Sequence, residues 1–369
     1  MAFIIKELKY PVFFMMLISR TILIDAQVLH DTASLNLVKR TVDQIYDMRF
    51  SEANETTNLL SKNYPEHPVV FLLRGMIIYW EGYPLLSGSE KGSEFEQQIR
   101  LCIDRSEEFG PENEAEFLLA NLCARGSLLA FYTGNDLPSK VFSLGSTSYR
   151  YLRRSFKFTG SFPDFLFFTG LYNYYREAYA EAHPVYKPLL AVFPRGNRDK
   201  GMLELRTAFR TSIFMKAEAS TFLSSNYKYF ENDFKNASYF SKLIFKVYPG
   251  NIVYRINCIE DLLLIQKYDD ARKLILSTSF EKDNKYYQAQ IMILNAILAE
   301  KNKDLNQAEK DYRNGIEIIS EYRSYGDQYK AYAYFGLSRI SASRNDSHNQ
   351  RVFQRRALDL TDFDQVDFN

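Results

Sequence analysis

The chain has 369 residues, of which 46% are hydrophobic and 25% are charged, and its formal net charge at pH 7 is +1. This composition is that of an ordinary globular protein and excludes a disordered or fibrous chain, and a charge so close to zero gives no overall attraction to nucleic acid or to an anionic membrane. With 16 Gly and 11 Pro the sequence has few turn residues, which argues against an all-β fold, whereas 27 Tyr and 29 Phe can fill a large interior.

The first 26 residues have the pattern of a secretory signal peptide. The basic start contains Lys6 and Lys9, and the apolar run extends from Val12 to Ile24. Ala26 is the small residue before the expected cleavage point. Because Arg20 interrupts the apolar run, that run is too short to span a bilayer comfortably. We therefore expect residues 1–26 to be removed and residues 27–369 to be exported to the periplasm. The alternative is an uncleaved membrane anchor, and membrane contact is expected only in that case.

The rest of the chain has the apolar spacing of helices almost throughout. Apolar residues three and four positions apart run through Leu35 to Met48, Glu114 to Phe131 and Gln288 to Ala299, with no competing alternation. Breaks occur at residues 64–65, 110–111, 134–135, 160, 163, 249–250 and 325–326. This pattern predicts about sixteen helices joined mainly by short turns, as in stacked helical hairpins.

Small residues recur at regular spacings along these helices. Ala53 is followed twelve residues later by Pro65, Ala237 is followed at the same spacing by Pro249, and Ala271 comes 34 residues after Ala237. Further small or aromatic residues at matching sites are Gly75, Ala308, Tyr312, Gly315 and Gly336. The pattern resembles the tetratricopeptide repeat family, in which small residues allow helices to cross closely.

The resemblance covers residues 35–82 and 213–360, and only loosely the divergent central part, residues 90–212. It implies an all-α fold for residues 27–369, a right-handed α-solenoid of about eight stacked helical hairpins. Gly75, Ala237, Ala271 and Ala308 are expected at tight helix crossings.

The sequence contains no recognisable catalytic or metal-binding motif. His30, His67, His183 and His348 are scattered without the spacing of a metal site, and no nucleophile elbow, phosphate-binding loop or dinucleotide motif occurs. We therefore expect no catalytic residue, no metal and no cofactor.

The cysteines leave two interpretations open. Cys102, Cys123 and Cys258 form no CxxC pair. Cys102 and Cys123 lie on neighbouring predicted helices, so they either form a disulfide in an oxidising compartment or act as buried small hydrophobic side chains.

The central part breaks the repeat spacing where aromatic and basic residues gather. A long loop is predicted from about Ala182 to Asn197, and it contains three prolines. The candidate binding residues are Tyr172, Tyr175, Arg176, Arg195 and Arg198. Tyrosine and arginine often carry the binding energy of interfaces, and arginines beside a helix start suit anions. The alternative is that the tyrosines pack inside the hairpin and the arginines lie in solvent.

The leading functional hypothesis is a non-enzymatic protein–protein interaction scaffold in the cell envelope. A stacked helical array offers a concave face to a protein partner, whose identity the sequence does not give, and needs no catalytic residue for that. The alternative hypothesis is a glycan-active enzyme with an α/α toroid. Such an enzyme requires paired carboxylates and usually stacks sugars on exposed rings, but the chain has a single tryptophan, Trp80. A deep pocket with two facing carboxylates would favour the enzyme.

Overall fold

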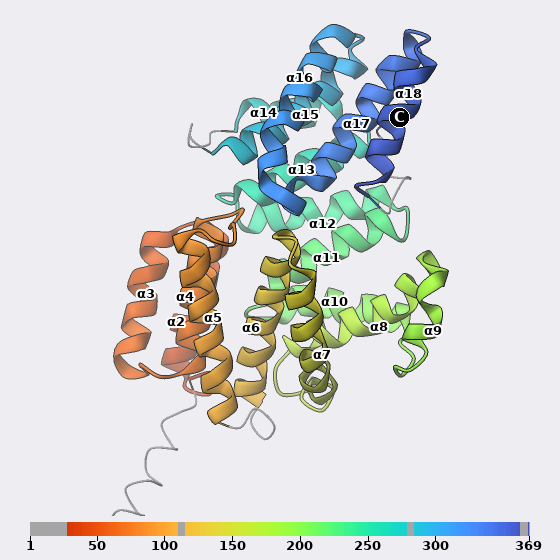
Figure 1. Cartoon of the computed structure of the whole chain (residues 1–369). Helices are drawn as coiled ribbons and strands as arrows, with labels where there is room; N and C mark the ends of the chain where they lie inside the picture. Colours follow the sequence, from red (N-terminus) through yellow and green to blue (C-terminus); the bar gives the residue numbers. More distant parts are fainter. Residues whose placement is uncertain (1–27, 110–114, 279–283, 362–367, 369) are drawn as a thin grey trace, which may run out of the picture.

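The structure of the chain is a computed structural model that describes residues 28–109, 115–278, 284–361 and 368 (Figure 1). Every regular element in these residues is a helix, and the helices pack on their neighbours in chain order. The predicted all-α class is therefore confirmed. The predicted signal peptide, residues 1–26, and the break at residues 110–111 lie outside the described residues.

The described helices form eight successive pairs. The first helices of the pairs are α2 (Thr32–Tyr46), α4 (Pro68–Glu81), α6 (Ala115–Gly134), α8 (Phe165–Ala182), α11 (Lys216–Tyr229), α13 (Ile252–Leu264), α15 (Lys285–Lys301) and α17 (Asp327–Ser343). The second helices are α3 (Phe50–Asn63), α5 (Glu90–Glu108), α7 (Pro138–Ser155), α10 (Arg198–Thr211), α12 (Phe234–Val247), α14 (Tyr268–Leu276), α16 (Leu305–Ile319) and α18 (Ser347–Leu358). The right-handed sense of the array stays a prediction.

Three short helical segments lie outside the pairs. They are η1 (Pro184–Tyr186), α9 (Lys187–Leu190) and η2 (Ser320–Gly326), of which η1 and η2 are 3₁₀ segments. The stretch predicted as one long loop, residues 182–197, therefore contains two helical turns. Pro184 opens the first of them, a position that proline favours because it has no N–H to leave unpaired.

Local sequence signals explain where several helices begin. The side chain of Asp31 accepts the N–H of Ser34 at the start of α2, and the side chain of Asn251 accepts two N–H groups at the start of α13. Both are caps that satisfy N–H groups left free by the first helical turn. Pro68 occupies the first turn of α4 in the same way that Pro184 opens η1.

The small residues of the repeat pattern lie in the interior. Ala237, Ala271 and Ala308 are fully buried. A Cβ atom added at Gly75 would overlap the Ile99 side chain of α5. Gly75 therefore lies at a close contact between α4 and α5, whereas the tight crossings expected at the three alanines stay a prediction.

Among the contacts that join the first half of the array to the second half, two lie at turns between helices, and we call them the closing contacts. In the first closing contact, the side-chain amide of Asn251 donates to the carbonyl of Tyr46 at 2.8 Å, and the N–H of Gly250 donates to the Asp47 carboxylate at 2.9 Å. A Cβ atom at Gly250 would lie only 2.5 Å from the Asp47 carbonyl oxygen. The turn between α12 and α13 therefore needs glycine to reach the end of α2.

The second closing contact joins η2 to the turns after α4 and α6. The Arg323 guanidinium donates to the Ser87 hydroxyl at 2.7 Å and to the carbonyl of Asn135 at 3.1 Å. The ring of Tyr325 packs so closely on Gly134 that no Cβ atom would fit there. In Figure 1 the later pairs accordingly lie above the ends of α4, α5 and α6.

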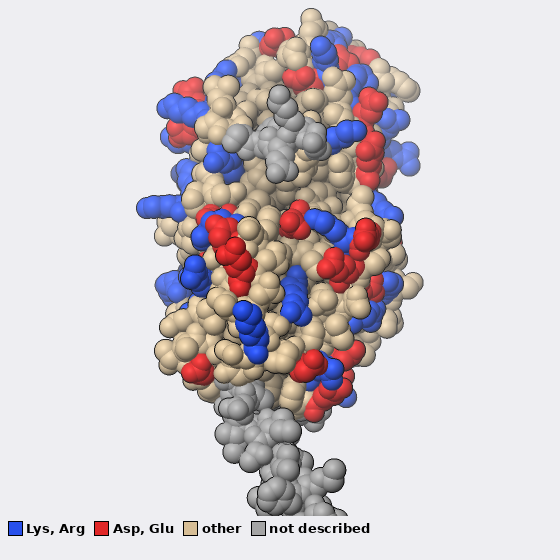
Figure 2. All heavy atoms as spheres, turned by 90° about the vertical axis from the view of Figure 1, so that its left-hand side faces the viewer, with Lys and Arg blue, Asp and Glu red and all other residues tan. Residues whose placement is uncertain are grey.

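The exterior carries charges of both signs. Figure 2 shows basic and acidic side chains intermixed over one face of the molecule, without a large area of a single sign. Among the described helices, none has the length and apolar character needed to cross a membrane.

Candidate functional site

A cavity of about 900 Å³ lies on the inner side of the array. All eight first helices of the pairs contribute to its wall, whereas among the second helices only α5, α7 and α12 do so. Tyr46 and Tyr325, which take part in the two closing contacts, also line it. The cavity is therefore the inner face of the array, partly closed off from solvent where the two halves meet.

Aromatic side chains are the largest class in the lining. They are Tyr46, Tyr79, Trp80, Tyr83, Phe95, Tyr149, Phe167, Phe168, Tyr172, Phe222, Tyr229, Tyr254, Tyr286, Tyr325 and Tyr329. The ring centroid of Trp80 lies 5.7 Å from Tyr46, 5.9 Å from Tyr83 and 5.7 Å from Tyr254. A partly open cavity of this size with apolar walls and a few polar groups is typical of ligand-binding sites.

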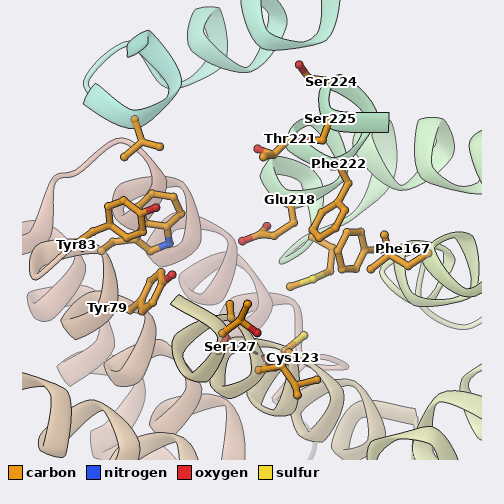
Figure 3. A pocket seen from close by; sticks show the side chains of 18 of the residues that line it. Tyr79, Tyr83, Cys123, Ser127, Phe167, Glu218, Thr221, Phe222, Ser224 and Ser225 are labelled. Carbon is orange, nitrogen blue, oxygen red and sulfur yellow. Dashed lines mark hydrogen bonds between the residues drawn. The ribbon is translucent and has the colours of Figure 1, made fainter. Parts of the chain in front are cut away.

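Glu218 of α11 is one of two acidic residues in this lining, and Glu260 is the other. Figure 3 shows the side chain of Glu218 extending from α11 toward the side where Tyr79 and Tyr83 lie. One carboxyl oxygen is hydrogen-bonded to the Tyr46 hydroxyl, and the other is buried without a hydrogen-bond partner. Burial raises the pKa of Glu218 to about 7, although the hydrogen bond from Tyr46 acts in the opposite direction. Both protonation states of Glu218 are therefore populated near neutral pH.

The Tyr46 hydroxyl connects Glu218 to the backbone. Its oxygen lies 3.0 Å from the carbonyl oxygen of Phe214 as well as beside Glu218. A phenol has a single hydrogen. When Glu218 is protonated, its carboxyl group donates to the Tyr46 hydroxyl, and Tyr46 donates its own hydrogen to the Phe214 carbonyl. When Glu218 is ionised, Tyr46 donates to Glu218 instead.

Asp164, just before α8, fixes the start of α11. Its carboxylate accepts the N–H groups of Ile213 at 2.9 Å, Phe214 at 2.6 Å and Met215 at 3.0 Å. Burial raises the pKa of Asp164, while these three N–H groups lower it. The carboxylate holds the segment that leads into α11, and with it the position of Glu218 in the first turn of the helix.

A buried ion cluster forms another part of the wall. Lys228 of α11 contacts Glu260 and lies 2.6 Å from the Asp261 carboxylate of α13. Glu260 also accepts hydrogen bonds from the hydroxyls of Tyr329 at 3.1 Å and Tyr332 at 3.0 Å. Burial disfavours the charged ammonium, but Asp261 and Glu260 hold the pKa of Lys228 above its usual value. The cluster therefore keeps one cation between two carboxylates.

The remaining charged residue of the lining, Arg125, is also paired. Its guanidinium donates to Glu107 at 2.8 Å, to Asn121 at 2.8 Å and to Thr147 at 2.8 Å. Each cation of the lining thus has an anionic partner. Among the described residues, no Lys or Arg forms an ion pair with Glu218, so negative charge is in excess at this site.

Of the candidates from the sequence, the two tyrosines lie on α8. Tyr172 lines the cavity, and its hydroxyl donates to the carbonyl of Pro194 at 2.6 Å. Tyr175 packs between helices, where its hydroxyl donates to the side chain of Asn226 of α11 at 2.6 Å. Tyr172 therefore belongs to the inner face, whereas the hydroxyl of Tyr175 joins α8 to α11.

The three candidate arginines lie in different surroundings. Arg198 forms ion pairs with Glu181 at 2.6 Å and Glu231 at 2.9 Å. Arg176 is largely buried on α8, with its guanidinium 3.6 Å from Glu177, and Arg195 is exposed. None of the three lines the cavity, and their role in binding stays a prediction.

Glu218 and the rings around Trp80 form one site that no motif in the sequence indicates. Trp80 stands out in the sequence only as the single tryptophan, and the residues around Glu218 form no recognisable motif.

Cys102 and Cys123 are both buried and free, and burial raises the pKa of each thiol. Among the residues that the structure describes, no group of three or more His, Cys, Asp or Glu side chains is placed to hold a metal ion.

Comparison with known proteins adds no relative. No protein-family model matches the chain, and no curated protein matches it significantly.

Proposed function

We propose that the protein is a non-enzymatic interaction protein that receives part of a protein partner in the cavity on its inner face. The observation that carries this proposal is the aromatic lining of the cavity, to which all eight first helices contribute. A ligand that covers accessible aromatic rings removes apolar surface from water, and this burial favours binding. A right-handed tetratricopeptide-like array, exported after loss of residues 1–26, is part of the same proposal.

The experiment fills the cavity without disturbing the fold. Gly126 of α6 lines the cavity, and a Cβ atom added there meets nothing within 4 Å. Gly126→Leu therefore occupies space that a partner needs. Gly160 is exposed in the turn after α7 and is equally open around its Cβ position, so Gly160→Leu is the matched control.

The readout is capture of a partner from an envelope extract by the immobilised protein. We expect the unchanged protein and Gly160→Leu to retain the same partner, and Gly126→Leu to lose it while keeping its thermal melt. Equal capture by Gly126→Leu would show that the partner does not use the cavity and would refute the proposal.

A glycan-active enzyme is the second candidate, and one observation favours it. A carboxyl group with a pKa of about 7 in an aromatic cavity has the properties of a general acid. The reaction needs a second carboxylate, and the other acidic residue of the lining, Glu260, is held by Lys228. Release of reducing sugar from a panel of envelope glycans, lost in Glu218→Gln, would support the enzyme; no release from any of them would leave the binding proposal.

A further inference from the structure

Around the cavity, carboxylate groups outnumber the cations that could neutralise them. Four charged residues line it, and two of them are the cations Arg125 and Lys228, which have their own carboxylate partners. Within the part of the chain that the structure describes, no Lys or Arg forms an ion pair with Glu218. The Lys228 cluster already holds one carboxylate more than its single ammonium can neutralise. A buried carboxylate in this situation either takes up a proton or takes a cation from outside.

The rings beside Glu218 pack edge to face around Trp80, and all three of them belong to the lining of the cavity. Tyr46, which is hydrogen-bonded to Glu218, meets the Trp80 ring at an interplanar angle of 76°, and Tyr254 meets Trp80 at 65°. Burial and the nearby Glu218 carboxyl both raise the pKa of Tyr254, so Tyr254 also lies next to the acid. Aromatic faces attract an organic cation that comes within about 6 Å of the ring centroid.

We propose that the cavity binds an alkylammonium group, with Glu218 as its counter-ion and the rings around Trp80 as its walls. This inference rests on the proposed function because it names the chemistry that the partner presents to the cavity. An ammonium group neutralises Glu218, and its alkyl substituents cover the rings. A neutral ligand of the same shape covers the rings but leaves Glu218 without a cation.

Alkylammonium groups have two sources, a free small molecule or a lysine side chain of a partner. Choline serves as the probe for the first, and Nα-acetyl-lysine methylamide serves as the probe for the second. Each has a neutral isostere. In the first, carbon replaces the choline nitrogen; in the second, 2-aminoheptanoic acid, which ends in a methyl group, replaces lysine. Trp80 is the only tryptophan of the chain, so its fluorescence reports directly on occupancy of the cavity.

Protonation of Glu218 gives a second readout. The titratable groups that face it are Tyr46 of α2, Cys123 of α6, Asp164 before α8, Tyr248 before α13 and Tyr254 of α13. Burial raises the pKa of the three tyrosines and of the thiol, so these four groups stay neutral from pH 6 to 8. Ammonium binding should therefore become about tenfold stronger between pH 6 and pH 8 as Glu218 ionises.

The experiment compares probes and variants by titration against Trp80 fluorescence. We expect at least one ammonium probe to bind at least about tenfold more tightly than its neutral isostere. We expect Glu218→Gln to lose both this preference and the pH dependence, and the tighter of the two ammonium probes to identify the source. Glu55→Gln, an exposed glutamate on the outer helix α3, is the control and should bind like the unchanged protein.

Two outcomes overturn the inference. One is binding of a neutral isostere as tight as that of its ammonium counterpart, and the other is the absence of binding by either ammonium probe at millimolar concentration. If partner capture still depends on Gly126 in either case, the proposed function stands and only the ammonium chemistry is wrong. If Gly126→Leu leaves capture unchanged, the proposed function itself is wrong.

Discussion

Replacing Glu218 by glutamine should stabilise the protein at alkaline pH. The ordinary pKa of a glutamate is 4.5, and burial raises that of Glu218 to about 7. The folded state therefore binds more protons than the unfolded state between these two values, so stability falls as pH rises from 4.5 to 7 and is constant above. At about 1.4 kcal/mol for each pH unit, the full interval corresponds to about 3.4 kcal/mol.

The expected gain is smaller because Glu218 borders a cavity that admits water, and about 2 kcal/mol at pH 8 is a reasonable figure. The glutamine amide keeps an oxygen that accepts from Tyr46 and carries no charge. Urea unfolding of the unchanged protein and of Glu218→Gln at pH 5 and pH 8 measures the effect. If both proteins lose the same stability between the two pH values, Glu218 does not titrate in this range, and the argument from its burial is wrong.

Three further substitutions, two of them with a control substitution, test helix packing and the ion pairs of Arg198. Gly201→Ala should destabilise by about 1–3 kcal/mol, because the new Cβ would lie 2.6 Å from the backbone nitrogen of Tyr174; Gly145→Ala, with open space around it, should be neutral or stabilising in the same urea assay. Ala271→Leu should cost about 1–3 kcal/mol, since this position is fully buried, and an unchanged melting temperature would contradict a tight crossing. Arg198→Ala should cost about 1 kcal/mol through its lost ion pairs, whereas exposed Arg195→Ala should stay within about 0.5 kcal/mol; equal effects would refute this contrast.

The pairing of helices could be predicted from the sequence because its signals are local. Ala237 lies in α12 and Pro249 follows the end of that helix. The next residue, Gly250, lies in the turn between α12 and α13. Glycine is needed at this position because Asp47, about 200 residues earlier in the chain, packs against it. The spacing does not reveal this contact. Local periodicity predicts the units, but the closure of the array depends on contacts between units far apart.

The cavity could not be predicted for the same reason. Trp80, Glu218 and Tyr254 come from α4, α11 and α13, and each looks like an ordinary residue of its own helix. The predicted candidates were instead drawn from one stretch where rings and arginines are adjacent in sequence. Of these, Tyr172 lines the cavity, while Arg198 forms ion pairs with Glu181 and Glu231.

The two closing contacts also change how such a chain must fold. In an open helical array each unit touches only its neighbours, so folding can start anywhere and spread, and the ends can fray independently. Here Arg323 meets Ser87 across 236 residues, and Asn251 meets Tyr46 across 205. Contacts of such sequence separation form late and slowly, because most of the chain must be ordered before they become favourable. A newly made chain therefore exposes its aromatic inner face until the second half is complete, and only then does that face become a cavity.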